Sequence, residues 1–310
     1  MKQSMLEPAS RAATLIHELG IWLYVGGGLA LALVVALTLY GAFSAPRKIS
    51  ERKWLVGGGI VFPSVVLLAL LAYAIHVGEA ISGAEGRNSE VEVIGKQWWW
   101  EVRYIADKGD SAASGGLPVL ANELRIPVGR PVQIALSTDD VIHSFWVPAL
   151  AGKVDMIPGR INRIVLQATT PGVYRGQCAE FCGAQHSWMA FYVVAEPEAE
   201  YRAWLARQAA PATEPANPFL ARGREVFLRE PCADCHTVRG TSAKGKLGPD
   251  LTHVGGRLSI GAGVLGNGAG ALAAWIADPQ HIKPGNLMPA TRTLEGEELR
   301  ALASYLESLK

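Results

Sequence analysis

The chain has 310 residues and a formal net charge of +1, so its length predicts two or three domains and its charge gives no reason to expect a nucleic-acid partner. Charged residues make up 18% of it, below the usual share of about 25%, and apolar residues make up 49%. The four cysteines form two local pairs, Cys178 with Cys182 and Cys232 with Cys235, which suit a metal or a cofactor better than a network of disulfides.

Two long apolar segments lie near the start of the chain. They cover residues 15–43 and 54–77, and each is longer than the roughly 20 residues that a helix needs to cross a bilayer. Both contain glycine triplets and the second contains Pro63, which neighbouring helices tolerate inside a membrane. A secretory signal is the alternative for the first segment, but this segment lacks a cationic start beside a short apolar core. A buried helix of a soluble domain is the alternative for the second. Together the segments predict a two-helix transmembrane hairpin.

The connector between these segments, residues 45–53, contains four basic residues. Short basic loops stay on the cytoplasmic side of a membrane. We therefore expect the N-terminus and the soluble domains on the outer, periplasmic side of a bacterial cell (inner) membrane. Glu51 lies just before the second segment. It is either a solvated loop carboxylate or an entry point for protons at the end of a membrane helix.

The pattern changes after residue 90 to short stretches with a period of two, separated by turn residues, which are typical of an antiparallel β-sandwich or barrel. These stretches cover residues 91–93, 98–104, 124–129, 131–136, 142–147, 161–168, 172–175 and 189–194. We expect an N-terminal segment with the hairpin in residues 1–89, a β domain in 90–195, a short helix and proline-rich linker in 196–217, and a helical domain in 218–310.

The loop of residues 176–189 joins two predicted strands and contains Cys178, Glu180, Cys182, His186 and Met189. Thiolate and thioether ligands favour copper, zinc or iron–sulfur clusters, and imidazole suits copper and zinc. A single copper ion would leave one thiolate unused, whereas two thiolates can bridge two copper ions. That arrangement needs a second histidine from elsewhere, with weak ligands from Met189 and a backbone carbonyl between the cysteines. A disulfide and a zinc site are the alternatives, and neither explains the histidine and methionine that follow the pair.

A second motif, Cys232-Ala-Asp-Cys235-His236, has the spacing of c-type haem attachment. Two thiols at this spacing can each form a thioether with one vinyl group of the haem, and the adjacent histidine then reaches the iron. A thioredoxin-like redox pair would need a βαβ setting that the pattern lacks. A zinc site would need two further ligands nearby.

The sixth ligand of such a haem should be a soft donor from across the ring. Met288 lies 52 residues after His236, in a loop rich in proline and glycine that suits an exposed ligand. Methionine ligation raises the potential of a haem. Ordinary core packing is the alternative for Met288, and His253 and His281 are the competing ligands.

Taken together, the motifs resemble subunit II of cytochrome c oxidase, which carries the binuclear copper centre CuA. The resemblance rests on the two spans, the β domain, the segment His143-Ser-Phe-Trp-Val-Pro148, and Cys178, which starts the metal loop 35 residues after His143. Segments 97–100 and 153–160 also resemble parts of the family. The haem motif after the linker is similar to the caa-type branch, whose subunit II carries its own cytochrome c. The resemblance covers residues 15–310 and implies a cupredoxin-like β domain followed by an all-α cytochrome c domain.

The resemblance also implies ligand roles. In the copper site, Cys178 and Cys182 would be bridges, His143 and His186 terminal ligands, and Met189 and the backbone oxygen of Glu180 weak ligands. The side chain of Glu180 would bind Mg²⁺ shared with subunit I. In the haem site, Cys232 and Cys235 would be the covalent attachments, with His236 and Met288 as axial ligands.

Two further roles follow from the same resemblance. The run Trp98, Trp99 and Trp100 resembles the family's electron-entry patch, with packing in a strand as the alternative for each residue. Trp99 stands where many relatives have tyrosine, which leaves its own role open. Glu51 resembles the glutamate that many subunits II place at the mouth of a proton channel.

The implied function is that of an electron-transfer subunit in a proton-pumping haem–copper oxidase, a translocase of the respiratory chain. Cytochrome c or another respiratory donor would reduce the haem, and the copper centre would pass electrons to subunit I, where oxygen is reduced to water. The chain would contact other oxidase subunits and the bilayer, and would have no oxygen site of its own. One alternative is the CuA electron-donor subunit of a nitric oxide reductase. Another is a membrane-anchored copper chaperone or sensor, which would need an exchangeable metal.

Overall fold

The computed structural model describes residues 1–45, 50–82, 89–105, 118–291 and 293–310. The chain divides into two compact units, one formed by Arg11–Ala84 and the other by Met1–Ser10 together with Glu85–Lys310. Two basic residues of the predicted connector, Arg47 and Lys48, lie outside the described residues.

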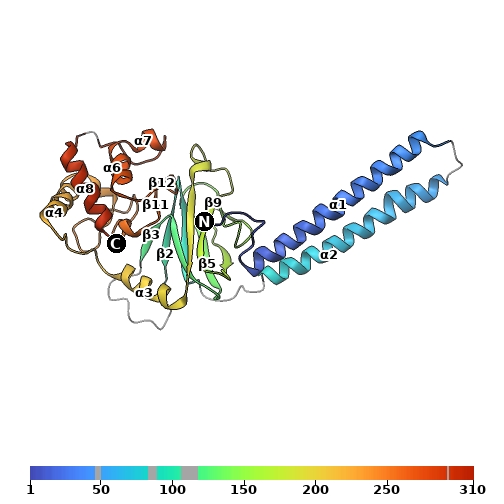
Figure 1. The fold of residues 1–310 in the computed structure, drawn as a ribbon, viewed down its shortest axis with the longest axis horizontal. Helices are drawn as coiled ribbons and strands as arrows, with labels where there is room; N and C mark the ends of the chain where they lie inside the picture. The colour runs from blue at the N-terminus through green and yellow to red at the C-terminus, as the bar shows by residue number, and fades with distance from the viewer. Residues whose placement is uncertain (46–49, 83–88, 106–117, 292) are drawn as a thin grey trace. The chain divides into compact units, whose positions relative to one another are not determined.

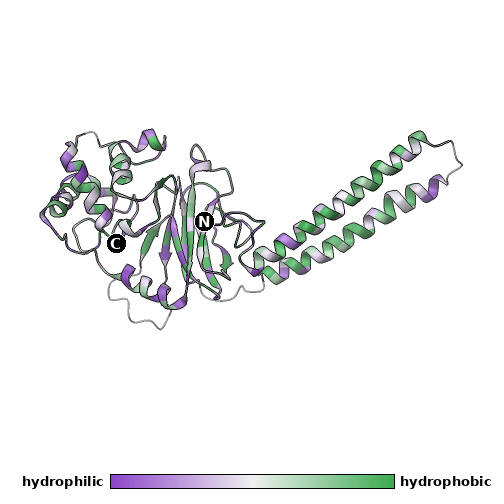
Figure 2. Ribbon diagram, in the orientation of Figure 1, coloured by the Kyte–Doolittle hydropathy of each residue, from purple (hydrophilic) through white to green (hydrophobic). Residues whose placement is uncertain are grey.

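The smaller unit is a pair of long apolar helices. Helix α1 spans Arg11–Phe43, and a π-helical segment, η1 (Lys53–Val61), leads directly into α2 (Phe62–Ser82). Most of their large apolar side chains are exposed, and the hydrophobic colour continues along most of each helix in Figure 2. The segments Arg11–Phe43, of 33 residues, and Lys53–Ile81, of 29 residues, are long and apolar enough to cross a membrane. They agree in position with the two predicted spans.

The β domain of the larger unit is a sandwich of two sheets (Figure 1), each with five strands among the described residues. The order in the first sheet is β3 (Val119–Ala121), β2 (Trp99–Tyr104), β1 (Val91–Lys96), β5 (Val132–Thr138) and β8 (Asn162–Leu166). The order in the second is β4 (Glu123–Pro127), β10 (Ala190–Glu196), β9 (Gly172–Cys178), β6 (His143–Trp146) and β7 (Val154–Met156). The predicted cupredoxin-like sandwich is therefore confirmed.

Two strand pairs of the sandwich run in parallel, β1 with β5 and β4 with β10. The expectation of an antiparallel sandwich is thus right about the class and misses these two pairs. The reason is that a period of two shows which face of a strand is buried and does not show the direction of its neighbour. The sequence pattern also does not predict the short strands β3 and β7, because three residues give no periodic signal.

Three buried aromatic rings form a floor beneath the metal loop, and we call Trp100, Phe145 and Phe191 the aromatic floor. The ring of Phe191 lies 5.0 Å from that of Trp100 and 4.6 Å from that of Phe145. Gly176 on β9 faces Phe191 so closely that any Cβ would collide with its ring. Interiors packed in this way deform little, so the loop rests on a stiff layer.

The first residues of the chain lie against the β domain. The main chain of Lys2 forms a parallel bridge with Tyr174 of β9. Further along, the N–H of Ala9 donates to the carbonyl of Ala149 at 2.8 Å, and the Ala9 carbonyl accepts the N–H of Thr169 at 2.9 Å. Main-chain hydrogen bonds of this kind cannot be predicted from a sequence pattern, and the sequence predicts no strand in residues 1–10.

A helix and the linker lead to the C-terminal domain. Helix α3 (Glu198–Ala209) packs Tyr201 and Trp204 into the β core, where the Trp204 ring lies 5.5 Å from Tyr104. The C-terminal domain then contains α4 (Pro218–Arg229), α5 (Cys232–Cys235), a 3₁₀ turn η3 (Val254–Gly256), a small hairpin of β11 (Ser259–Ile260) and β12 (Leu265–Gly266), α6 (Ala269–Ala277), α7 (Pro279–Ile282) and α8 (Gly296–Ser308). The predicted helical domain is confirmed, and the small hairpin is an addition to it.

Helices α4 and α8 cross at Gly223, where a Cβ would collide with the carbonyl of Ala301. We expect Gly223→Ala to destabilise the C-terminal domain, because overpacking of this kind costs about 1–3 kcal/mol. Each 1 kcal/mol lowers the midpoint of a domain of this size by about 4–8 °C. Thermal unfolding of the full-length chain, followed by circular dichroism, measures the change.

The matched control is Gly270→Ala in α6, where no atom lies within 4 Å of the added carbon. This change should leave the midpoint in place or raise it, because alanine favours a helix over glycine. An unchanged midpoint in Gly223→Ala would contradict the close helix crossing.

Candidate copper and haem centres

The two cysteines of the metal loop are buried, and their thiols are not joined. Their Sγ atoms lie 3.7 Å apart, far beyond the disulfide bond length of about 2 Å. The Nδ1 atom of His143 lies 3.8 Å from Sγ of Cys178. Ligand atoms of His143, Cys178 and Cys182 are all within 4.8 Å of one another. The structure thus brings a second histidine to the loop from β6.

The other predicted donors gather around the same two sulfur atoms. The Sγ atom of Cys182 lies 3.7 Å from Nδ1 of His186 and 3.8 Å from Sδ of Met189. The Sγ atom of Cys178 lies 3.1 Å from the backbone oxygen of Glu180. Every group that the sequence assigned to copper is therefore in one place.

Main-chain contacts set the position of this loop. Cys178 is the last residue of β9, and its N–H donates to the carbonyl of Met189 at 3.0 Å. The N–H of Ala179 donates to the carbonyl of Ser144 at 3.0 Å, which ties the loop to β6. A 3₁₀ turn, η2 (His186–Trp188), then returns the chain to β10. The donor positions follow from the fold of the strands.

The spacing of the donor atoms suits a soft metal ion. Tetrahedral metal–sulfur bonds of about 2.3 Å and metal–nitrogen bonds of about 2.0 Å place neighbouring donors roughly 3.5–3.8 Å apart. The side-chain donors here are 3.7–3.8 Å apart. Hydrogen bonds from Cys182 and His143 lower the pKa of Cys178, while its neighbour Cys178 raises the pKa of Cys182. Each thiol thus changes the acidity of the other, and the thiolate is the form that a metal binds.

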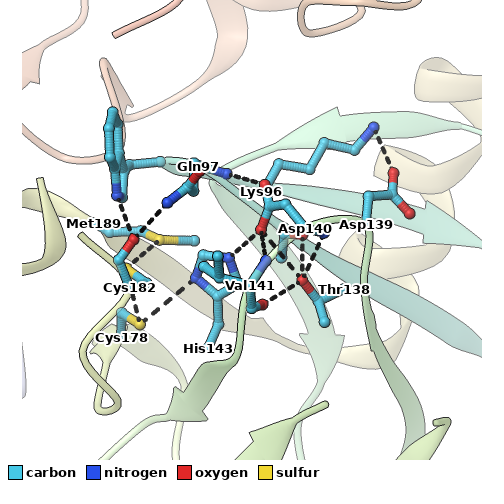
Figure 3. A network of polar contacts seen from close by, with 12 residues as sticks. Lys96, Gln97, Thr138, Asp139, Asp140, Val141, His143, Cys178, Cys182 and Met189 are labelled. Atoms are coloured by element: carbon cyan, nitrogen blue, oxygen red, sulfur yellow. Dashed lines mark hydrogen bonds and ion pairs between the residues drawn. The ribbon is translucent and has the colours of Figure 1, made fainter. Parts of the chain in front are cut away.

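A carboxylate that the motifs did not single out orients His143. Asp140 Oδ1 lies 2.8 Å from Nε2 of His143, the ring nitrogen that does not face Cys178 (Figure 3). The other oxygen of Asp140 accepts the main-chain N–H of Gln97 at 2.7 Å. Burial lowers the pKa of His143, but hydrogen bonds to Cys178 and Asp140 outweigh it and raise the pKa overall. A carboxylate in this place fixes the ring and makes the opposite nitrogen a stronger ligand. Asp140 could not be identified as the partner of His143 from the sequence, because an aspartate three residues before a histidine is too common to indicate such a pair.

The three predicted electron-entry tryptophans differ in their surroundings. The indole N–H of Trp98 donates to the carbonyl of Cys182 at 2.9 Å, and that of Trp100 donates to the carbonyl of Met189 at 3.4 Å. Trp99 is partly buried, and Nζ of Lys96 lies 5.5 Å from the centre of its ring. Trp98 and Trp100 therefore contact the metal loop, and Trp100 is also part of the buried aromatic floor.

Two predicted carboxylate sites lie at the surface. The side chain of Glu180 is 45% exposed, and its Oε2 lies 3.4 Å from Nζ of Lys153. Its remaining lone pairs are of the kind that Mg²⁺ prefers. Glu51 is exposed and immediately precedes η1, in the helical unit.

The predicted haem motif forms the short helix α5 with His236 just beyond its end. Nδ1 of His236 lies 2.8 Å from the carbonyl of Pro249, so this nitrogen carries the proton and leaves Nε2 free as a ligand. Burial lowers the pKa of His236, which keeps the ring neutral. A Cβ at Gly248 would lie 2.5 Å from this ring. Cys232 and Cys235 are unpaired and partly buried. This set fits a covalently attached haem.

Met288 lies against the core of the C-terminal domain, and its sulfur accepts the indole N–H of Trp275 at 3.1 Å. The competing ligand His253 has both ring nitrogens within 3.1 Å of main-chain carbonyl oxygens, so neither is open to a metal. His281 is exposed on α7. The hydrogen bonds of His253 argue against it as a ligand, and Met288 stays the predicted sixth ligand.

Comparison with known proteins agrees with both centres. Residues 90–196 match the periplasmic domain of cytochrome c oxidase subunit II, and residues 220–310 match the cytochrome c family. A cytochrome c oxidase subunit 2 from Alkalihalophilus pseudofirmus is 40% identical over 272 residues, which cover 86% of this chain and 76% of that protein. The chain belongs to the cytochrome c oxidase subunit II family. Another subunit 2, from a Bacillus species (strain PS3), is 32% identical over 269 residues and covers 81% of this chain and 72% of its own.

Solved structures also resemble parts of this subunit II. The periplasmic domain of subunit II of the Bradyrhizobium japonicum cytochrome oxidase is 29% identical and covers 39% of this chain and 94% of its own, with a TM-score of 0.32. The c-type cytochrome SorU from Sinorhizobium meliloti is 30% identical and covers 29% of this chain and 90% of its own, with a TM-score of 0.23. These TM-scores are low, and the family assignment rests on the sequence relatives.

Family membership confirms the predicted function as a subunit of cytochrome c oxidase with its own cytochrome c domain. The subunit II domain implies a CuA centre, and the cytochrome c domain implies haem c. Membership of the oxidase implies subunit I as a partner. The two apolar helices fit a membrane-anchored subunit of a bacterial oxidase.

We expect Asp140→Asn to weaken copper binding about 10–100-fold, the usual cost of losing such a ligand-orienting partner. The reduction potential of the copper centre should also rise, because a neutral amide makes His143 a poorer donor to the oxidised metal. Copper titration and a redox titration of the purified subunit measure both effects.

The control for this change is Asp139→Asn, whose carboxylate pairs with Lys96 at the surface. It should leave copper affinity and potential unchanged. If the two variants behave alike, Asp140 does not orient the copper ligand.

Proposed function

We propose that this subunit accepts electrons at its cytochrome c domain and delivers them to subunit I from a copper site with six donor groups. Cys178, Cys182, His143, His186, Met189 and the backbone oxygen of Glu180 hold two copper ions. The observation that carries this proposal is the gathering of these donors, 3.1–3.8 Å apart, around two thiols that are not joined. A single zinc ion would need four of the six donors.

When bound, a thiolate-bridged copper pair and a covalent haem supply one-electron redox steps. The residues around them limit how much the sites rearrange. Main-chain hydrogen bonds at Cys178 and Ala179 fix the loop. Asp140 fixes the ring of His143. The aromatic floor excludes water from below, and a stiff, dry site favours rapid electron transfer because few groups must move.

In the C-terminal domain, Cys232 and Cys235 form the thioethers and His236 and Met288 are the axial ligands. The hydrogen bond from His236 to Pro249 supports the first axial ligand, since it presents Nε2. The contact of Met288 with the indole of Trp275 supports the second, since it holds the sulfur in the domain interior. The domain takes electrons from cytochrome c or another respiratory donor.

The remaining assignments concern the membrane and its surface. The side chain of Glu180 binds Mg²⁺ shared with subunit I, supported by its exposed carboxylate. The two helices span a bacterial inner membrane with the N-terminus and soluble domains on the periplasmic side. The basic residues Arg52 and Lys53 at the start of the second helix support this orientation. Glu51, beside them, receives protons at the cytoplasmic surface.

Two variants test the two centres against each other. We expect Cys182→Ser to abolish the electron-spin-resonance signal of an electron shared by two copper nuclei, because one bridge is lost, while haem absorption stays normal. We expect Met288→Ala to remove the weak red absorption band of sulfur-ligated haem iron, while the copper signal stays normal.

Each variant is the control for the other. A shared-copper signal that survives in Cys182→Ser would refute the bridged pair. An unchanged red band in Met288→Ala would assign the sixth position to another residue.

Glu51→Gln tests the role at the proton entrance. We expect oxidase turnover to fall several-fold in the reconstituted complex, because an amide cannot carry a proton, with copper and haem spectra unchanged. The control is Glu79→Gln near the other end of α2, which should turn over normally. Equal turnover in both variants would remove Glu51 from the proton path.

A further inference from the structure

One lysine of the cytochrome c domain is buried in contact with the metal loop of the β domain. Lys283 follows α7 directly, and its residue is only 2% exposed. Its Nζ donates to the carbonyls of Trp98 and Trp188, both at 2.8 Å, and to that of Gly261 at 3.2 Å. An ammonium group has three N–H donors, so this arrangement satisfies all of them. Two of the acceptors belong to the β domain.

The burial of Lys283 is compensated only when the two domains are in contact. Burial lowers the pKa of Lys283 to about 7, which reflects the cost of removing an ammonium group from water. Carbonyl dipoles offset that cost, and among the described residues the cytochrome c domain supplies one of the three acceptor carbonyls, that of Gly261. Packing within that domain therefore gives no reason for a charged residue at this position, whereas docking against the β domain does.

Other hydrogen bonds cross the same boundary. The N–H of Ala190 donates to the carbonyl of Ala262 at 3.0 Å, and the N–H of Leu258 donates to the buried carboxylate of Glu123 at 2.8 Å. A Cβ on Gly263 would lie 3.0 Å from that of Ala190. The main chains of the two domains are thus in direct contact, which restricts the motion of one domain relative to the other.

Lys283 joins the neighbourhoods of the two predicted centres. Trp98, whose carbonyl accepts Lys283, also donates its indole N–H to Cys182. On the other side, the Lys283 carbonyl accepts Nδ2 of Asn286 at 2.7 Å, and Oδ1 of Asn286 accepts the N–H of Met288 at 2.9 Å. Hydrogen bonds, together with the residues between them, therefore link the backbone of Cys182, a proposed copper ligand, to the backbone of Met288, a proposed haem ligand, through Lys283.

We propose that Lys283 is a positioning residue that clamps the cytochrome c domain to Trp98 and so sets the rate of electron transfer from this domain to the copper site. The inference rests on the proposed function, in which Cys182 and Met288 are ligands. Trp98 then receives electrons from the attached cytochrome c domain, and an external donor delivers its electrons to that domain.

The first test measures docking without using activity. Full-length Lys283→Met removes the charge and keeps a similar length. Hydrogen–deuterium exchange of peptides containing the Ala190 and Leu258 amides should become at least tenfold faster, because both amides bond across the boundary. Exchange of α8 inside the cytochrome c domain should not change. The control, Lys246→Met, alters an exposed lysine of the same domain and should match the parent chain.

The second test measures electron transfer in the assembled oxidase. After photochemical reduction of the haem, electron arrival at copper should slow at least tenfold in Lys283→Met and stay normal in Lys246→Met. Copper and haem spectra should remain those of the parent, which would show that the ligands are unchanged. Gly263→Ala, whose methyl group would press on Ala190, should slow transfer in the same way without touching Lys283. Because Gly263 has a φ of +83°, alanine also strains its own loop, so exchange of α8 must first show that the domain stays folded before this variant replaces Lys283→Met.

Unchanged exchange, or faster exchange with unchanged transfer, would overturn the clamp. Absence of a bridged-copper or haem signal in the parent chain would instead refute the proposed function. The two failures are therefore distinguishable.

Discussion

The larger unit depends on keeping two thiols buried and close together without joining them in a disulfide. A polar group in an interior needs partners. Here Cys178 lies beside an imidazole and a carbonyl oxygen, and Cys182 lies beside an imidazole and a thioether. Cys178 ends β9 while His143 starts β6, so the pairing of these two strands decides where the first donors meet. The aromatic floor and Gly176 then leave no space into which the loop could relax. The stiffness expected of an electron-transfer site is thus a property of strand pairing and core packing.

The cytochrome c domain reaches a similar result by other means. Its predicted haem ligands lie next to helices and loops rather than on strands, so hydrogen bonds outside any sheet hold them in place. The carbonyl of Pro249 selects the protonated nitrogen of His236. On the other side, Nε2 of Gln280 donates to the carbonyls of Asn286 and Met288 at 2.7 and 2.9 Å, which closes the loop onto itself. The β domain fixes its predicted donors by strand pairing, whereas the cytochrome c domain uses a main-chain carbonyl for His236 and an amide side chain for the loop of Met288.

The functional residues that could be predicted from the sequence are those that lie together in one short stretch. The donors between Cys178 and Met189 and the motif from Cys232 to His236 were evident because their spacing is itself the signal. His143 came from the family resemblance, since nothing in its strand distinguishes a ligand from a core histidine. Asp140 and Lys283 could not be predicted, because their partners include main-chain groups 43 and 185 residues away, whose positions follow only from the folded topology.

The segment before the first apolar helix has a consequence for how the β domain is completed. Strand β9 pairs with β10 along most of its length but meets β6 only near its last residue. The backbone of Lys2 occupies the side that β6 leaves open, giving its N–H to Val173 and accepting that of Arg175, both at 2.9 Å. An uncovered strand edge invites pairing with another chain. The segment before the first apolar helix therefore covers the edge of a strand that lies far from it in the sequence, and a chain lacking this segment would leave that edge open to pairing with another chain.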